Sequence, residues 1–213
     1  MTKRIKLALQ KKGRLTDACR QIFEKGGLSC KEADRQLVYS IPEAPIDLLF
    51  VRDDDIPALV SNGVCDFGIV GLNVFQETKY EKQGNFNAEI FAPLGIAKCR
   101  LAIAVPENKK LDTLSDLNNL KIATTYPAIV KNFLKEKELN SQIVYLSGSV
   151  EIAPQLLLSD VIADIVSSGA TLKENNLKEV VTILNSEAVL INNKDIDEQA
   201  KGVANRLITI FEN

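Results

Sequence analysis

The sequence predicts an α/β protein of two lobes, with mostly parallel sheets, crossover helices and a ligand cleft between the lobes. Three observations lead to this prediction. Short apolar runs alternate with amphipathic stretches, the pattern of parallel strands joined by helices. The chain has 213 residues, 46% of them hydrophobic, which is enough for two small folded cores. The segment Ala92-Pro93-Leu94-Gly95 contains the turn-forming residues Pro and Gly and separates two sets of expected strands.

The first lobe is expected to comprise residues 1–90 and 184–213. Its early elements are a strand over Ile5–Leu9, a helix over Leu15–Glu24 that Gly26 and Gly27 end, and strands over Ile46–Val51 and Asp66–Gly71. A short helix with Pro57 in its first turn is expected between the last two, capped by Asp53, Asp54 or Asp55.

The end of the chain is expected to return to the first lobe. The hydrophobic pattern there predicts a strand over Ala188–Ile191 and a helix over Ile196–Phe211. Six apolar side chains fall on one face of that helix, at Ile196, Ala200, Val203, Ala204, Leu207 and Phe211.

The second lobe, residues 91–183, is expected to hold its own strand set. The strands are predicted over Cys99–Val105, Lys121–Thr125, Ile143–Leu146 and Val161–Val166, with helices over Pro127–Lys137 and Glu151–Leu158. No repeat or low-complexity segment is visible, so a solenoid is not expected.

The amino-acid composition excludes several kinds of catalytic and metal site. The chain has no histidine, which removes histidine acid–base catalysis, the Ser-His-Asp triad and His-ligated metal sites. The net charge is −2 without a long basic run, so a small polar or anionic ligand is expected rather than nucleic acid. The charged N-terminus and the absence of a long apolar run predict a cytoplasmic protein that does not cross a membrane. The dispersed Cys19, Cys30, Cys65 and Cys99 are expected to be reduced core residues.

A phosphate-binding turn is predicted after the strand Val161–Val166. Ser167, Ser168, Gly169, Ala170 and Thr171 follow that strand, so backbone N–H groups, hydroxyls and a helix start would face an anion. Asp164, just upstream, is suited to accept hydrogen bonds from ribose hydroxyls, and Glu151 would join it. The alternative is purely structural, because the spacing of Thr171 and Glu174 is that of a capping box.

Two cationic segments follow strands of the first lobe. Lys11, Lys12 and Arg14 follow the first strand, where ligands of open α/β sheets bind, and the planar fork of Arg14 suits a departing pyrophosphate. Arg52 precedes Asp53, Asp54 and Asp55, a cluster that would bind magnesium, organise an arginine or cap a helix. The structural alternative for the first segment is an ordinary solvated helix start.

Taken together, these motifs resemble the ATP phosphoribosyltransferase family over almost the whole chain. The resemblance rests on Lys12-Gly13-Arg14-Leu15, the Arg52 to Pro57 segment, Asp66 to Gly71, Ala123 to Pro127, Gly148 to Pro154 and Asp164 to Leu172. Two positions depart from the family pattern. The turn has Ser168 where the family usually has Thr, which keeps the hydroxyl, and Ala170 stands where Arg is frequent.

The resemblance implies a fold, a reaction and partners. The fold is that of type II periplasmic binding proteins. The reaction is the first step of histidine biosynthesis, in which ATP and 5-phosphoribosyl 1-pyrophosphate, brought with Mg²⁺, give N1-(5-phosphoribosyl)-ATP and pyrophosphate. The chain length resembles the short form of the family, which implies a homodimer and a regulatory subunit similar to histidyl-tRNA synthetase in a hetero-octamer.

The resemblance also implies roles for single residues. The 5-phosphate is assigned to Ser167 through Thr171, the ribose hydroxyls to Glu151 and Asp164, and the pyrophosphate to Arg14 with Lys11 or Lys12. Arg52, Asp66, Gly71 and Tyr126 are weaker candidates for ATP contacts, and no direct metal ligand is assigned. A binding module of the two-lobed type and a nucleotide sensor without catalysis remain alternatives, because a fold alone does not specify an activity.

Overall fold

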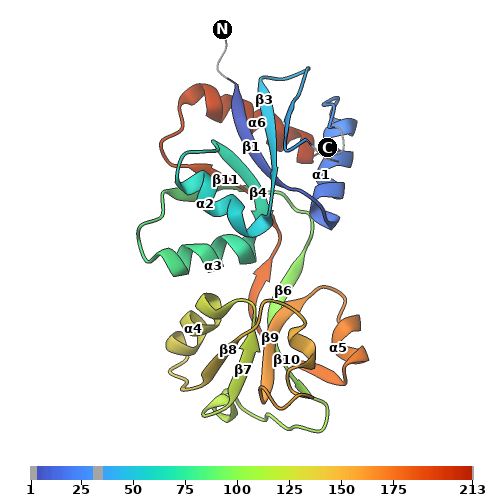
Figure 1. The fold of residues 1–213 in the computed structure, drawn as a ribbon, viewed down its shortest axis with the longest axis vertical. Coiled ribbons are helices and arrows are strands. Elements are labelled where there is room, and N and C mark those ends of the chain that lie inside the picture. The colour runs from blue at the N-terminus through green and yellow to red at the C-terminus, as the bar shows by residue number, and fades with distance from the viewer. Residues whose placement is uncertain (1–3, 31–35, 213) are drawn as a thin grey trace. The chain divides into compact units, whose positions relative to one another are not determined.

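A computed structural model describes residues 4–30 and 36–212, and the chain divides into two units (Figure 1). The first unit runs up to Ala97 and resumes at Glu187, and the second is Lys98–Ser186. Strand pairing explains this division, because β5 (Ala88–Pro93) pairs within the first sheet and β10 (Leu177–Ser186) within the second.

The first unit is built on a mixed sheet with a parallel core. Its strand order is β2-β3-β1-β4-β11-β5. The strands not yet given are β1 (Ile5–Gln10), β2 (Val38–Ser40), β3 (Ile46–Val51), β4 (Phe67–Gly71) and β11 (Ala188–Asn193). β1 pairs in parallel with β3 and β4, whereas β2, β11 and β5 pair antiparallel with their neighbours. The four strands predicted for this lobe are confirmed, and the chain end does return to it.

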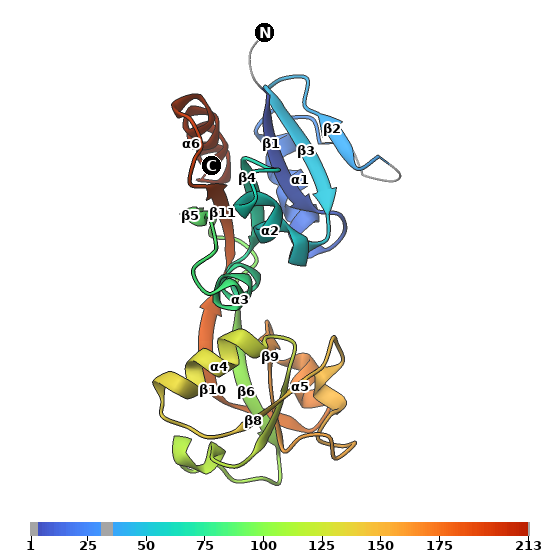
Figure 2. The same ribbon diagram turned by 60° about the vertical axis from the view of Figure 1, so that its left-hand side comes forward.

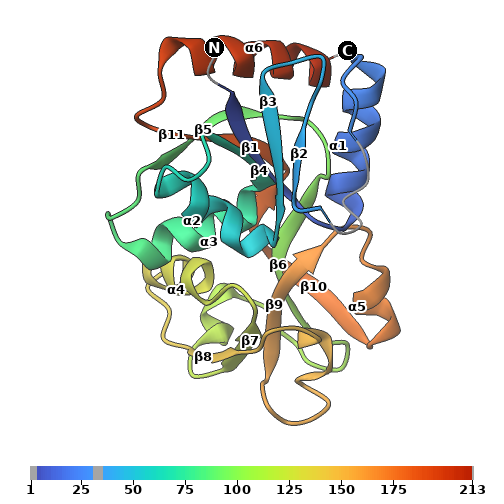
Figure 3. The same ribbon diagram turned by 45° about the horizontal axis from the view of Figure 1, so that its top comes forward.

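Helices cover both faces of this sheet. On one face α1 (Arg14–Lys25) lies beside α6 (Glu198–Glu212), as Figure 3 shows, and the rings of Phe23 and Phe211 are 5.7 Å apart. The predicted apolar face of α6 is confirmed, with Ala200, Val203, Ala204 and Leu207 buried and Ile196 and Phe211 packed against the same core. On the other face α2 (Ile56–Ser61) and α3 (Leu72–Lys82) cover a second core.

The second unit has a five-stranded sheet in the order β10-β6-β9-β7-β8. Its other strands are β6 (Cys99–Pro106), β7 (Lys121–Thr124), β8 (Gln142–Tyr145) and β9 (Val161–Val166), all four close to the predicted ranges. β7 pairs in parallel with β8 and β9, and β6 lies antiparallel between β9 and β10. The helices α4 (Pro127–Glu136) and α5 (Ala170–Glu174) pack on opposite faces, visible in Figure 2.

The helix predicted over Glu151–Leu158 is wrong. The structure has a short 3-10 turn, η3 (Val150–Ile152), followed by tight turns. Pro154 has no N–H to donate within a helix, and Leu157 adopts a positive φ of 57°, which a right-handed helix excludes. A second such turn, η2 (Leu114–Leu117), was not predicted.

The prediction of free core cysteines is confirmed for Cys19, Cys30 and Cys65 but not for Cys99, which lies outside the core. All four are free thiols; Cys19, Cys30 and Cys65 are buried, while Cys99 is half-buried. Burial raises the pKa of Cys19 to about 12 and that of Cys65 to about 11, so both stay protonated at neutral pH. Within residues 4–30 and 36–212, none of the helices is long and apolar enough to cross a membrane.

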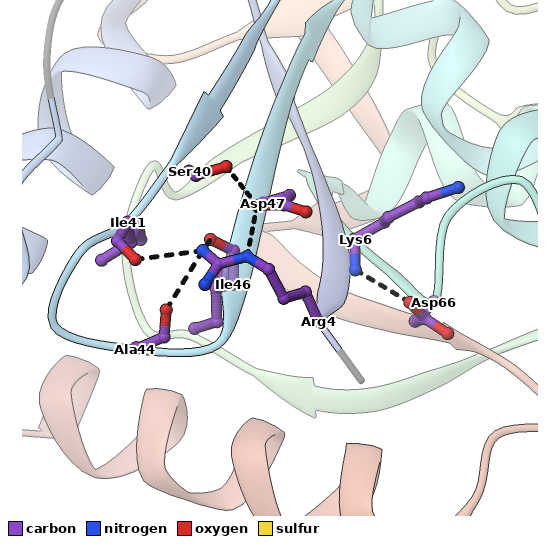
Figure 4. A network of polar contacts seen from close by, with 8 residues as sticks. All are labelled: Arg4, Lys6, Ser40, Ile41, Ala44, Ile46, Asp47 and Asp66. Carbon is purple, nitrogen blue, oxygen red and sulfur yellow. Dashed lines mark hydrogen bonds and ion pairs between the residues drawn. The ribbon is translucent and has the colours of Figure 1, made fainter. Parts of the chain in front are cut away.

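Arg4 ties the start of β1 to the hairpin of β2 and β3, as Figure 4 shows. Its Nε donates to Oδ1 of Asp47 at 2.7 Å, and its Nη2 donates to the carbonyls of Ile41 and Ile46 at 3.0 and 2.8 Å. The Ser40 hydroxyl also donates to Asp47, at 2.6 Å. These bonds link the hairpin to the starts of β1 and β3, the two strands whose other ends carry the predicted cationic segments.

Partial burial raises the pKa of Asp47, but the hydrogen bonds from Ser40 and Arg4 and the charges of Arg4 and Lys6 outweigh it, so the net pKa is lowered. The folded state therefore prefers the ionised carboxylate. We expect Asp47→Asn to cost about 1 kcal/mol of unfolding free energy at pH 7. The difference from the wild type should be complete above about pH 4, the ordinary aspartate pKa, and shrink as the pH falls through the folded-state value.

Thermal midpoints of both proteins between pH 7 and pH 3 measure this difference. Ser40→Ala is a matched control, because it removes one donor and keeps the carboxylate, so its loss should be smaller. A difference that grows on acidification would contradict the prediction.

Candidate functional site

The cationic segments of the first unit meet at the carboxyl ends of β1 and β3. Lys11 and Lys12 follow β1, and Arg52 follows β3. Together with Asp53, Asp54 and Asp55 these side chains line a pocket of about 480 Å³. Arg14, the first residue of α1, is exposed and comes two residues after Lys12. The structure therefore brings Arg52 together with Lys11 and Lys12, although Lys12 and Arg52 are 40 positions apart in the sequence.

Backbone bonds hold the Lys11 loop in place. The N–H of Lys11 donates to the carbonyl of Val51 at 2.8 Å, extending the pairing of β1 with β3 past its end. The hydroxyl of Thr16, which is 2% exposed, donates to the carbonyl of Gln10 at 2.6 Å. Gly13 has φ of 136°, which other residues rarely adopt, and this conformation lets the chain turn from the loop into α1. The cations thus project from a fixed backbone, not from a loose loop.

The acidic triplet does not cap α2 with a side chain. Asp53, Asp54 and Asp55 form a 3-10 turn, η1 (Asp53–Asp55), and Asp55 stands at the N-cap of α2 without a side-chain capping bond. The capping prediction is wrong in this respect. The amides of Asp55 and Ile56 already donate to the carbonyls of Arg52 and Asp53, and Pro57 has no N–H to cap.

Three neighbouring carboxylates, those of Asp53, Asp54 and Asp55, place negative charges close together. Burial raises the pKa of Asp54, the carboxylates of Asp53 and Asp55 raise it further, and Arg52 lowers it. Within the part of the chain that the structure describes, no three His, Cys, Asp or Glu side chains are grouped to hold a metal ion. The interaction that the structure gives for the triplet is therefore electrostatic, between Asp54 and its charged neighbours.

Gly71 and Asp66 lie at opposite ends of β4. Gly71 ends the strand and is the N-cap of α3; a Cβ there would lie 2.5 Å from Oδ1 of Asn73, so any other residue would require the Asn73 side chain to move. Asp66 precedes the strand, and its Oδ2 accepts the N–H of Lys6 at 2.8 Å. Gly71 thus belongs to the same sheet edge as Lys11 and Arg52, whereas Asp66 does not.

In the second unit, Asp164 and Glu151 are close enough to interact. Asp164 is on β9, and Glu151 is in η3, which packs against that strand. Burial raises the pKa of Asp164; a bond from the N–H of Ile165 lowers it, and the charge of Glu151 raises it again. A half-buried carboxylate with a second acid beside it is a ready acceptor for paired hydroxyl groups.

The predicted turn follows β9 directly. Ser167 and Ser168 are exposed, Gly169 has φ of 82°, and α5 begins at Ala170. Because Gly169 is the N-cap, Thr171 lies inside the helix, and the capping-box alternative for Thr171 and Glu174 is excluded. The helix has only five residues, so an anion here would depend on the N–H groups and hydroxyls of the turn more than on a helix dipole.

Tyr126 lies at the same sheet edge as this turn. It follows β7, which is parallel to β9, and it is the N-cap of α4. Its N–H donates to the hydroxyl of Thr124 at 2.9 Å. Thr124 is fully buried, so this bond holds the turn before α4 in one conformation.

Two charged residues near the Ser167 turn were missed by sequence reasoning. Arg100 on β6 donates to both carboxylate oxygens of Glu179 on β10, and its Nη1 is 3.4 Å from the carbonyl oxygen of Ser167. A guanidinium at the start of the apolar run Cys99–Val105 was the available signal, because a charged residue in a central strand requires a partner.

Comparisons with known proteins identify relatives over most of the chain. Residues 52–213 match the family model of ATP phosphoribosyltransferase. The ATP phosphoribosyltransferase of Phocaeicola vulgatus is 43% identical over 208 residues, which are 98% of this chain and 71% of that protein. The enzyme of Bacteroides thetaiotaomicron is also 43% identical, over 96% of this chain and 70% of its own length.

Solved structures agree with this relationship. The ATP phosphoribosyltransferase complex HisG:HisZ of Thermotoga maritima contains a chain that superposes with a TM-score of 0.79 at 27% identity, covering 98% of both chains. The periplasmic aliphatic sulphonate binding protein of Escherichia coli has a TM-score of 0.64 at 17% identity, covering 99% of this chain and 72% of its own, which shows a shared two-lobed fold alone. On the family match and the identity of its relatives, this chain belongs to the ATP phosphoribosyltransferase family.

Proposed function

We propose that this protein condenses ATP with 5-phosphoribosyl 1-pyrophosphate to N1-(5-phosphoribosyl)-ATP and pyrophosphate, the first step of histidine biosynthesis. The observation that carries the proposal is the 43% identity with ATP phosphoribosyltransferases over almost the whole chain. The geometry supports it, because one unit carries a carboxylate beside an open Ser-Gly turn and the other a pocket lined by three cations.

The reaction suits a chain without histidine. The adenine N1 has its own lone pair, so the bond from N1 to the anomeric carbon forms as the bond from that carbon to pyrophosphate breaks, and no proton must leave the nucleophile first. The protein then contributes orientation of two anions and stabilisation of charge on the leaving group. Arginine, lysine and backbone N–H groups are sufficient for both tasks.

We assign the phosphoribosyl group to the second unit. Ser167, Ser168, Gly169, Ala170 and Thr171 would hold the 5-phosphate through hydroxyls and N–H groups. Asp164 and Glu151 would accept the two ribose hydroxyls. The electrostatic interaction between these acids supports a shared role, since adjacent hydroxyls present two donors side by side.

We assign the phosphate chains to the first unit. Arg14 with Lys11 or Lys12 would stabilise the departing pyrophosphate, and the shared pocket of Lys11, Lys12 and Arg52 supports an anion at this edge. Arg52 and Gly71 of this unit would contact ATP, and Tyr126, which belongs to the second unit, is the third proposed ATP contact. Asp66 is left out of this assignment, because its carboxylate accepts a backbone N–H at the other end of the strands.

Magnesium and a partner protein belong to this proposal. Mg²⁺ would enter bound to the pyrophosphate substrate, as part of that substrate. The Thermotoga maritima relative is part of a HisG:HisZ complex. By analogy we propose that this chain is a cytoplasmic catalytic subunit that forms a homodimer and joins a regulatory subunit similar to histidyl-tRNA synthetase in a hetero-octamer.

The direct test mixes purified protein with ATP, 5-phosphoribosyl 1-pyrophosphate and Mg²⁺. We expect near-ultraviolet absorbance of the N1 adduct to rise together with released pyrophosphate. A binding module, which the sulphonate-binding fold represents, would bind a ligand and release no pyrophosphate. Absence of both products, also after the regulatory partner is added, would remove the proposed activity.

Arg14→Ala should lower kcat by about 10²- to 10³-fold, because a preorganised donor to the leaving group would be lost. Steady-state kinetics with both substrates measures the effect. Arg206→Ala is the matched control, since Arg206 is an exposed arginine of α6 outside the proposed site, and its kcat should equal that of the wild type. An unchanged kcat in Arg14→Ala would show that Arg14 has no leaving-group role.

Asp164→Asn should weaken 5-phosphoribosyl 1-pyrophosphate binding by roughly tenfold or more and stabilise the fold at neutral pH. The raised pKa means that ionised Asp164 costs folding free energy, fully above its folded-state pKa and not at all below about pH 4. The stability gain of the variant should therefore vanish on acidification.

Asp160→Asn is the control with the opposite sign. The Lys121 N–H and Lys109 outweigh partial burial and lower the pKa of Asp160, so its ionised form stabilises the fold and its replacement should reduce the thermal midpoint at pH 7. Substrate binding should not change in Asp160→Asn. Equal effects of both variants on stability would contradict the interpretation of Asp164.

A further inference from the structure

Arg100 connects three segments of the second unit. Its Nε and Nη2 donate to the two carboxylate oxygens of Glu179 at 2.7 and 2.6 Å, a two-point ion pair. Its third nitrogen, Nη1, donates to the carbonyl oxygen of Ser167 at 3.4 Å. The hydroxyl of Thr182 also donates to Glu179, at 3.2 Å. Strands β6 and β10 thus hold one guanidinium against the first residue of the turn after β9.

The strand register puts Arg100 on the face of the sheet that carries Asp164. In the pairing of β6 with β9, Arg100 is opposite Val166 and Ala102 is opposite Asp164. Positions two apart on a strand point to the same face. Ala102 and Val166 belong to the core under η3 and α5, so Arg100, Asp164 and the Ser167 turn share that face.

We propose that Arg100 is a positioning residue for the 5-phosphate turn, and that Glu179 both holds its guanidinium in place and offsets its charge. The inference rests on the proposed function, because it requires Ser167 through Thr171 to bind the 5-phosphate. It adds a residue distant in sequence that acts on the turn through the Ser167 carbonyl.

The peptide plane transmits this effect. In a planar trans peptide the carbonyl of Ser167 and the N–H of Ser168 point in opposite directions. A guanidinium that holds the carbonyl therefore also sets the direction of the Ser168 N–H, one of the groups expected to face the anion. Because this restraint exists before the ligand binds, the turn loses less conformational entropy when it binds the phosphate.

The charges of Arg100 and Glu179 affect anion binding at the turn in a second way, which can be tested separately. Arg100 and Glu179 are formally neutral together beside a turn expected to receive an anion. Neutralising Glu179 leaves a net positive charge near the phosphate, whereas neutralising Arg100 leaves a net negative one. A salt bridge that serves only the fold would be weakened in both variants, so that alternative predicts effects of equal sign on binding.

The experiment compares Arg100→Gln with Glu179→Gln, in which the new amide can still accept a bond from Arg100. Calorimetric titration of each full-length variant with 5-phosphoribosyl 1-pyrophosphate and Mg²⁺, and separately with ATP, gives dissociation constants without requiring turnover. We expect Arg100→Gln to bind the sugar diphosphate about three- to tenfold more weakly and Glu179→Gln two- to threefold more tightly. ATP binding should not change in either variant.

Ser168→Ala distinguishes failure of this inference from failure of the proposed site. If Ser168→Ala and Arg100→Gln both leave sugar diphosphate binding unchanged, the turn is not the phosphate site and both proposals fail. If only Ser168→Ala weakens binding, or if both charge variants weaken it equally, the site stands and the positioning role of Arg100 is overturned. The thermal melting curve of each variant is recorded first, and the titrations are carried out at a temperature at which all variants are folded.

Discussion

Parallel pairing of the central strands is the constraint on which the rest of the structure depends. Strands that run in the same direction end at the same edge, so whatever follows them collects there. In the first unit this brings Lys11 beside Arg52, and the bond from the Lys11 N–H to the Val51 carbonyl continues the pairing into the loop. In the second unit it brings Tyr126 and Ser167 to one edge, because β7 and β9 are parallel.

The aspartates discussed above fall into two groups: in one the folded structure favours the ionised carboxylate and lowers its pKa, and in the other it disfavours the ionised form and raises the pKa. Asp47 and Asp160 each accept bonds from cations and N–H or hydroxyl groups, and their lowered pKa values mark them as parts of the scaffold. Asp164 is half-buried beside Glu151, and its pKa is raised. Groups whose ionisation is costly are frequent at functional sites, and this observation supports the role proposed for Asp164, because hydroxyl donors of a ligand would relieve that cost.

The elements that sequence reasoning missed have patterns that tertiary contacts override. β10 contains two register shifts against β6, so its apolar residues do not alternate cleanly. The helix α3 buries Asn73, Glu77 and Thr78 along with apolar residues, which removes the amphipathic signal. The segment Glu151–Leu158 has an apolar composition suited to a helix, but Pro154 and the positive φ of Leu157 turn it instead.

By itself the sequence predicted eight of the strands, though not β2, β5 or β10, together with the return of the last helix and the motifs of the family, because periodicity, glycines and charged loop residues are local signals. It also led to the assignment of chemical roles to particular segments, which stays a prediction. The tertiary structure alone decided which distant groups meet. Arg100 reaches Ser167 across 67 residues and Glu179 across 79, and Arg52 shares a pocket with Lys11. Such contacts depend on strand order and register, which follow from packing the whole sheet. The charge of Arg100 in an apolar strand signals that a partner is needed, but it does not say which residue that partner is.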